Sequence, residues 1–286
     1  MNTSQLQQHA YALLEQNYQH KEWLVKFSAN EGFAHIGDSR GIETIVEGLQ
    51  HSSALIRERA VKAISALQDA SLSDLVIPLA TSDSDPRVRG HAIAAIAQLD
   101  YDSHFTTITQ ALTDEHDFVK KCAVDALCLN YSEQSHDELK LLAFGEQDIY
   151  MPYPLRLEAA YHLAFEHPIG YDALYEMLES RDEWVQFLAA KKLALLQDEK
   201  ALPFLNSMVA NGDWESKLSA IDSLIHMDEY SIGDATLLKP THSPDLKTKI
   251  SAALVLSSIL PEPARDVVKF AMNSEEEELQ LHVILN

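Results

Sequence analysis

The sequence predicts an all-α solenoid, a stack of short helical hairpins, from two observations. A pattern of about 15 residues recurs along the chain at intervals of about 31 residues, and its apolar residues recur three and four positions apart. Both features are typical of helix pairs that stack on one another. Composition agrees, because 46% of the 286 residues are apolar whereas only 9 are glycine and 10 are proline, too few for a turn-rich β fold.

The repeat is clearest in two segments that superpose without gaps, residues 53–67 (SALIRERAVKAISAL) and 85–99 (DPRVRGHAIAAIAQL). Each copy has a basic or polar marker residue, an alanine three positions later and a large apolar residue four positions after that, which places the last two on one helix face. The markers are Lys26, Arg57, Arg89, Lys120, Arg156, Gln186, Lys217 and Lys249. The alanines are Ala29, Ala60, Ala92, Ala123, Ala159, Ala189, Ala220 and Ala252, and the large residues are Phe33, Ile64, Ile96, Leu127, Leu163, Leu193, Leu224 and Leu256.

Successive markers lie 31, 32, 31, 36, 30, 31 and 32 residues apart, which leaves room in each unit for two short helices and two turns. We expect second helices in segments with a similar apolar spacing, namely 41–49, 72–80, 105–113, 171–178 and 201–209. First helices are expected to begin at residues whose side-chain oxygen caps unpaired amides, namely Ser53, Asp85, Asp182, Asp213 and Asp245. Pro86 then occupies the first helical position, where its missing N–H costs nothing.

The pattern predicts one solenoid domain over residues 1–286, with about eight repeats in 21–274. Residues 1–20 hold an amphipathic segment, 4–19, that we expect to cap the first unit. Residues 275–286 restart the repeat pattern and are expected to form a C-terminal capping helix. A free acidic tail is the alternative for this last segment.

Acidic residues outnumber basic ones by 44 to 22, a formal net charge of −22, which would repel a phosphate backbone. We therefore expect no nucleic-acid binding, and both a solvated acidic surface and a surface for a basic protein partner stay open. The sequence shows neither a membrane span nor a signal-peptide pattern, so we expect a cytoplasmic protein that binds no membrane. Cys122 and Cys128, six residues apart, are expected to be free thiols.

The segment 83–99, DSDPRVRGHAIAAIAQL, resembles the HEAT-repeat superfamily, in particular its short bacterial repeats related to the bilin-lyase E/F subunits. The resemblance covers residues 21–274 and implies a right-handed superhelix of αα-hairpins. Such repeats occur in scaffolds, adaptors and a few enzymes. We predict a non-catalytic protein–protein interaction module with an acidic surface, either a scaffold or adaptor or an immunity-type inhibitor. A bilin-lyase-like or other HEAT-repeat enzyme is the alternative.

Enzymes of this superfamily require features that the sequence does not supply. The di-iron hydroxylase with HEAT repeats uses paired His-Glu motifs, yet none of the 13 histidines here precedes a glutamate. The alkylpurine DNA glycosylases need a basic groove, which conflicts with the net charge of −22. Glu158 and His162 lie at metal-ligand spacing on one helix face but lack further ligands. We therefore expect no catalytic residue, metal or cofactor.

The markers Arg57, Arg89, Lys120 and Arg156 form a basic series that would suit an anion-binding groove or ion pairs between repeats. Ion pairing is favoured because acidic residues lie in the same or the adjacent turn, for example Asp85 four positions before Arg89.

The long spacing of 36 inserts about five residues around 145–154 (GEQDIYMPYP), and insertions in solenoids often lie on the binding face. Pro152 and Pro154 predict an extended loop that exposes Tyr150 or Tyr153. Five of the ten tyrosines lie in this insert and the next unit, and tyrosine is frequent at interfaces. Aromatic packing at a kink of the solenoid is the alternative. The candidate partner-binding residues are Tyr150, Tyr153, Tyr161, His162, Tyr171 and Tyr175.

The charge yields a first test. Binding of a labelled DNA duplex, followed by fluorescence anisotropy, should be undetectable at a physiological salt concentration of about 0.15 M. Micromolar affinity for the duplex under these conditions would contradict the inference drawn from the net charge.

Overall fold

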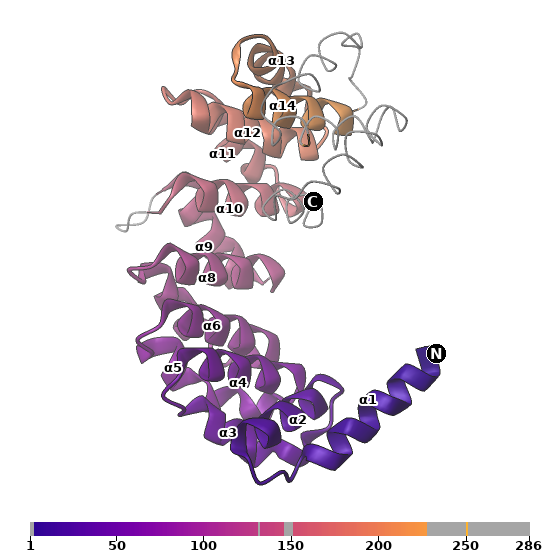
Figure 1. Cartoon of the computed structure of the whole chain (residues 1–286). Coiled ribbons are helices and arrows are strands. Elements are labelled where there is room, and N and C mark those ends of the chain that lie inside the picture. The colour runs from indigo at the N-terminus through magenta and orange to yellow at the C-terminus, as the bar shows by residue number, and fades with distance from the viewer. Residues whose placement is uncertain (1–2, 131, 146–150, 228–249, 251–286) are drawn as a thin grey trace. The chain divides into compact units, whose positions relative to one another are not determined.

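A computed structural model describes residues 3–130, 132–145, 151–227 and 250, and the chain divides into two compact units, 1–159 and 160–286 (Figure 1). Every regular element in the described part of the chain is helical. The prediction of an all-α fold is therefore confirmed. The boundary between the units falls inside one helix, α10 (Tyr153–Glu166).

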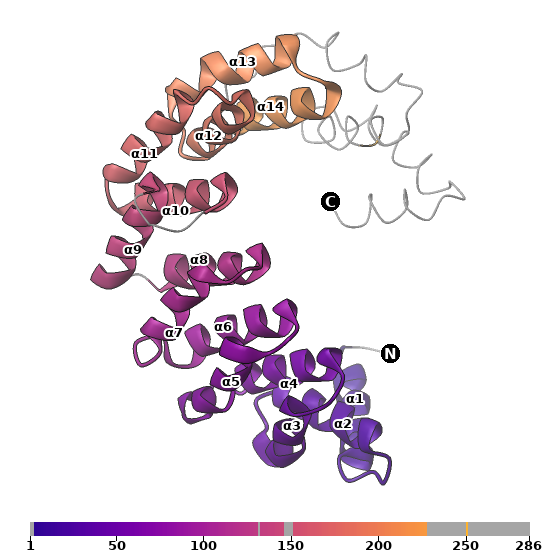
Figure 2. The same cartoon turned by 90° about the vertical axis from the view of Figure 1, so that its left-hand side faces the viewer.

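The first unit contains hairpins whose helices form two rows (Figure 2). The helices that carry the repeat pattern lie side by side in what we call the first-helix row, and the intervening helices form the second-helix row. The first-helix row consists of α2 (Trp23–His35), α4 (Ala54–Ala66), α6 (Pro86–Asp100) and α8 (Asp117–Leu129). The second-helix row consists of α3 (Ile42–Leu49), α5 (Ile77–Ser82), α7 (Phe105–Gln110) and α9 (Glu133–Phe144). Short 3-10 helices adjoin the first three of these, namely η1 (Ser39–Gly41), η2 (Ala70–Leu75) and η3 (Ala111–Thr113).

The second unit repeats this arrangement (Figure 2). Its first-helix row holds the C-terminal part of α10 together with α12 (Glu183–Leu195) and α14 (Trp214–His226). Its second-helix row holds α11 (Ile169–Leu178) and α13 (Leu202–Asn211), with η4 (Glu199–Ala201) leading into α13. Packing of α12 against α11, α13 and α14 ties the two rows together.

The register predicted for the core is confirmed wherever it falls on described residues. The seven described alanines of the pattern are at most 5% exposed, and the seven large apolar residues at most 1%. Ala252 and Leu256 lie outside the described residues. A small residue at this position lets neighbouring helices approach closely, and the large residue one turn later fills the remaining space. The chain is thus an all-α solenoid.

Helix starts follow the predicted caps with one difference. The carboxylates of Asp85, Asp182 and Asp213 accept hydrogen bonds from amides in the first turn of α6, α12 and α14. Ser53 does precede α4, but among the described contacts its hydroxyl makes no capping bond. Pro86 is the first residue of α6, as predicted, and Asp245 lies outside the described residues.

The insert around residues 145–154 differs from the prediction in where its loop ends and the next helix begins. Gly145 closes α9 in the left-handed conformation with φ of 67°, and residues 146–150, which include Tyr150, are outside the described part. The expectation of a loop that extends through Pro154 is wrong, because Tyr153 and Pro154 form the first turn of α10. A proline is tolerated there since the first amides of a helix have no partner within it.

At the N-terminal end, α1 (Thr3–Asn17) lies against α2. The rings of Tyr11 and Tyr18 meet the Phe33 ring edge-on, with centroid distances of 5.7 and 6.0 Å. The predicted cap at 275–286 lies outside the described residues. The single domain over the whole chain stays a prediction.

Two smaller expectations concern the thiols and the membrane. Among the described residues, neither Cys122 nor Cys128 is in a disulfide, as predicted, and burial raises the pKa of Cys122 to about 11, which keeps this thiol protonated at neutral pH. Across the described helices, none is both long and apolar enough to cross a bilayer.

The alanine register predicts the effect of overpacking. Replacing the fully buried Ala92 or Ala189 with Leu should lower the free energy of unfolding by about 1–3 kcal/mol, since the added carbons meet a close helix contact. Chemical denaturation would measure the change. Ala94→Leu, at a partly exposed position of the same helix, is the matched control and should change stability by less than about 0.5 kcal/mol. Equal stability of all three variants and the parent would contradict the register.

Candidate partner-binding site

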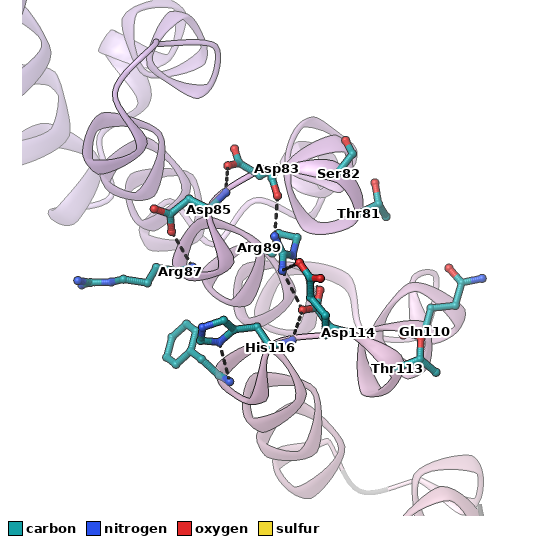
Figure 3. Close-up of polar contacts among 12 residues, drawn as sticks. Thr81, Ser82, Asp83, Asp85, Arg87, Arg89, Gln110, Thr113, Asp114 and His116 are labelled. Carbon is teal, nitrogen blue, oxygen red and sulfur yellow. Dashed lines mark hydrogen bonds and ion pairs between the residues drawn. The ribbon is translucent and has the colours of Figure 1, made fainter. Parts of the chain in front are cut away.

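The marker residues Arg57 and Arg89 connect successive units of the stack, and Figure 3 shows the contacts of Arg89. The Arg89 guanidinium donates hydrogen bonds from Nε and Nη2 to the Asp114 carboxylate, both at 2.8 Å, and from Nη1 to the carbonyl of Asp83 at 2.8 Å. Arg57 binds the Asp83 carboxylate in the same way, at 2.6 and 2.7 Å, and also donates to the carbonyl of His51 at 2.9 Å. Each guanidinium thus connects the turns that follow two successive helices of the second-helix row.

The predicted ion pairing holds for these two arginines, but the partner expected for Arg89 is wrong. Asp85, four residues before Arg89, accepts a hydrogen bond from the Arg87 amide and so caps α6 (Figure 3). The partner is Asp114 instead, which lies 25 residues along the chain. The Asp85 carboxylate, at the N-cap of α6, already accepts a hydrogen bond from an unpaired amide of its own helix.

Other marker residues donate hydrogen bonds to backbone carbonyls that precede, in the sequence, the helix that carries the marker. Arg156 Nη2 donates to the carbonyl of Ala143 at 3.1 Å, Gln186 Nε2 to that of Ser180 at 2.8 Å, and Lys217 Nζ to that of Ala210 at 3.2 Å. These acceptors lie at or just beyond the end of a second helix, where carbonyls have no partner within the helix. In the described contacts, the basic series therefore binds carboxylates and carbonyls of neighbouring elements, which argues against an anion-binding groove.

The carboxylates of Asp83 and Asp114 are held in the charged form. Burial alone would raise their pKa values, but hydrogen bonds from Arg57 and Arg89 outweigh it and leave both pKa values below the ordinary 3.8. Each pair consequently contributes stability only while its aspartate is ionised.

The predicted aromatic residues do not come together in one place. Tyr153 lies in the first turn of α10, 42% exposed, and the Arg156 guanidinium is 5.1 Å from its ring centroid. Tyr171 and Tyr175 lie on α11, in the second-helix row. Tyr161 and His162 lie near the C-terminal end of α10, in the first-helix row. The sequence reasoning grouped residues that belong to different rows.

Tyr175 has a structural role of its own. Its hydroxyl donates a hydrogen bond to the Asp198 carboxylate at 2.6 Å, and the Lys200 ammonium lies 3.3 Å from its ring centroid. Burial, together with the neighbouring Asp198, raises the pKa of Tyr175 to about 12. Because Asp198 also caps η4, this contact fixes the turn that leads into α13.

Tyr161 is the centre of an aromatic cluster on α10. The Phe165 ring meets it edge-on at 4.9 Å, the His162 ring lies at 5.6 Å, and the Lys192 ammonium of α12 lies 4.6 Å from its centroid. A lysine over a tyrosine face is attracted by the ring electrons. These contacts hold Tyr161 in place, while Phe165 stays 60% exposed.

Three large apolar side chains are exposed in the described part of the second unit, and all three lie in the first-helix row. Phe165 is 60%, Trp184 56% and Leu195 45% exposed. Sequence reasoning missed Trp184 and Leu195. The repeat offers a signal for them, since they lie two positions before and nine positions after the marker Gln186, where the pattern leaves side chains outside the core.

A pocket of about 220 Å³ opens between α12 and α13, beside Trp184. Phe187, Phe204 and Met208 supply apolar lining, and Glu183 and Gln186 are among the polar residues that complete it. The Trp184 ring packs on Phe187 with a centroid distance of 5.8 Å, so the exposed indole adjoins the pocket. We call Phe165, Trp184, Leu195 and this pocket the apolar surface of the second unit.

Metal binding finds no support among the described residues, where no three histidine, cysteine, aspartate or glutamate side chains are grouped to hold an ion. This statement includes Glu158 and His162, whose spacing had suggested a ligand pair.

Comparison with known proteins supports the fold. Residues 73–143 match the family model of HEAT repeats. The structure is similar to that of YibA from Escherichia coli, with a TM-score of 0.51 and 15% identity over 90% of this chain and 97% of that one. This likeness shows the fold alone.

Two further structures align less well. The CpcE–CpcF complex of phycocyanin lyase from Nostoc sp. PCC7120 gives a TM-score of 0.46 with 16% identity, over 85% of this chain and 91% of that one. Human deoxyhypusine hydroxylase gives 0.35 with 17% identity, over 89% and 97%. No curated protein is a significant match to the sequence.

The Arg89–Asp114 pair predicts a dependence of stability on pH. Asp114→Asn should lower the free energy of unfolding at pH 7 by about 3 kcal/mol, because it leaves a guanidinium with only 10% of its side chain exposed without its carboxylate. Because the folded-state pKa of Asp114 lies below 3.8, this contribution is complete above about pH 4 and is lost as the pH falls through the folded value. Urea denaturation of both proteins between neutral and acid pH measures it.

Glu115→Gln is the control for this change. The Glu115 side chain is 90% exposed, and its Oε1 atom lies 3.9 Å from Arg89 Nη2, too far for a hydrogen bond. It should alter stability by less than about 0.5 kcal/mol. A difference between the parent and Asp114→Asn that stays constant down to pH 2 would contradict the proposed origin of the effect.

Proposed function

Since the chain is an all-α solenoid that carries HEAT repeats, we propose that it is a non-catalytic protein-binding module whose partner docks on the apolar surface of the second unit. The observation that carries this proposal is the exposure of Phe165, Trp184 and Leu195 along one row of helices, together with a partly apolar pocket that Trp184 adjoins through Phe187. Two kinds of protein would use such a surface. One is a scaffold or adaptor, and the other is an immunity-type inhibitor.

The composition of the surface supports binding of a protein. A few large aromatic residues carry most of the binding energy in many interfaces, and tryptophan and tyrosine are the most frequent among them. Tyr161 is already held by Phe165 and Lys192, so little side-chain freedom would be lost on binding. The pocket beside Trp184 is large enough to receive one side chain of the partner.

Of the predicted binding residues, Tyr161 and His162 belong to this proposal. Tyr171 and Tyr175 lie on α11 in the other row, and Tyr175 is engaged by Asp198. Tyr153 is exposed at the start of α10 and would belong to a separate contact. Tyr150 lies outside the described residues.

The charge of the chain supports a basic partner. A net charge of −22 attracts a basic protein over several ångströms and accelerates encounter, while the apolar surface sets how slowly the complex dissociates. Added salt should therefore slow association more than it changes dissociation.

A pull-down from the native host followed by mass spectrometry tests the proposal. The tagged parent protein should retain a stoichiometric protein partner, and the variant Phe165→Ser with Trp184→Ser should bind it at least about tenfold more weakly, a loss of about 1.4 kcal/mol. Leu55→Ser is the matched control, since Leu55 is equally apolar, 63% exposed and in the first unit. A co-purifying pigment without a protein partner would favour the enzymatic alternative.

A further inference from the structure

The N-terminal helix α1 exposes an apolar face of its own. Leu6 and Leu13 are 54% and 48% exposed. Leu6, Ala10 and Leu13 are spaced four and three residues apart, which aligns them along one side of the helix, as in the seam of a coiled coil. Leu14, on the neighbouring side, packs so closely on Gly32 of α2 that a Cβ there would lie 2.6 Å from its Cδ2 atom.

An apolar groove adjoins this face. It lies between α1 and α2, has a volume of about 500 Å³, and is lined chiefly by Leu13, Leu14, Leu24, Val25 and Ala29. Leu24, on the α2 side, is 50% exposed. The same end of the molecule thus carries both projecting leucines and a groove that accepts apolar side chains.

The repeat explains why the groove is open. The residue before the marker is buried in the inner units, at 6% exposure for Ile56 and 0% for Val88 and Val119, whereas the equivalent Val25 is partly exposed. Each inner helix is covered by the unit before it, whereas among the described residues α1 alone takes that position for α2. Within the described part of the chain, the groove is therefore a stacking surface of the first repeat that α1 covers incompletely.

The charge distribution identifies what fits this surface. Residues 1–14 contain no aspartate, glutamate, lysine or arginine, although such residues make up 23% of the chain. A basic partner would find no complementary charge on this face. Two copies of a chain with a net charge of −22 repel each other, and this repulsion is weakest where the contact is made by uncharged segments.

We propose that two copies of the chain form a two-fold symmetric dimer in which α1 of each copy inserts Leu6 and Leu13 into the α1–α2 groove of the other. A symmetric contact of this kind needs one patch that is complementary to itself, and the adjacent leucines and groove provide it. A helix of 15 residues is about 22 Å long, so the interface is small and the dimer dissociates at low concentration.

Sedimentation velocity of the full chain over the micromolar range tests the proposal. The parent should change from monomer to dimer with rising concentration, and Leu6→Glu combined with Leu13→Glu should remain a monomer at every concentration, because the carboxylates would be buried in the apolar groove of the other copy. Leu55→Glu, at an exposed leucine of α4, should dimerise like the parent. Added salt should strengthen the dimer, since it screens the repulsion between acidic chains.

A parent that stays monomeric throughout this range, or a dimer that the paired leucine variants leave intact, would overturn the proposal. Leu6→Gln with Leu13→Gln, which adds no charge and keeps helix-forming residues, should also weaken the dimer at least tenfold. It preserves the test if the glutamates disturb α1, and circular dichroism checks that both variants fold. Phe165→Ser with Trp184→Ser should leave the dimer unchanged, which separates this inference from partner binding.

Discussion

Close contact between neighbouring first helices is the constraint on which the rest of this chain depends. Each hairpin is too small to bury its own apolar face, so burial is shared between units. The alanine at the register position, at most 5% exposed in every described unit, permits the short distance between helices, and the large residue one turn later fills the space beside it. Because every unit repeats this contact, its side-chain sizes are fixed, while residues on the outward faces are free to vary.

This constraint made the fold predictable from the sequence. The spacing of alanines and large residues gave the helices of the first row, and Asp85, Asp182 and Asp213 marked where they begin. The partner of Arg89 could not be predicted in the same way. A carboxylate four residues away and one 25 residues away are both plausible partners, and the choice depends on the offset between successive units, which no local pattern encodes.

The candidate site was predictable only in part, for a similar reason. Counting tyrosines pointed to part of the region where we propose the binding surface, and it found Tyr161 beside the exposed Phe165. It did not separate α10 from α11, although these helices lie in different rows, so it grouped Tyr161 with Tyr175, whose hydroxyl donates a hydrogen bond to Asp198. Trp184 and Leu195 were overlooked because single exposed residues make no cluster in the sequence. Both lie on α12, and they share one row with Phe165 of α10 only after these helices are stacked.

The electrostatics of the chain then constrain where association is favourable. Arginines such as Arg57 and Arg89 each neutralise an aspartate within the stack, so the pairs remove equal numbers of both charges and leave the excess of 22 acidic residues unchanged. A surface that carries this excess favours basic partners and disfavours a second copy of the same chain. An uncharged stretch such as residues 1–14 is the place where that disadvantage is smallest. A basic partner and a second copy would therefore use different surfaces, the first drawn by the acidic field to the apolar surface of the second unit and the other seated on α1.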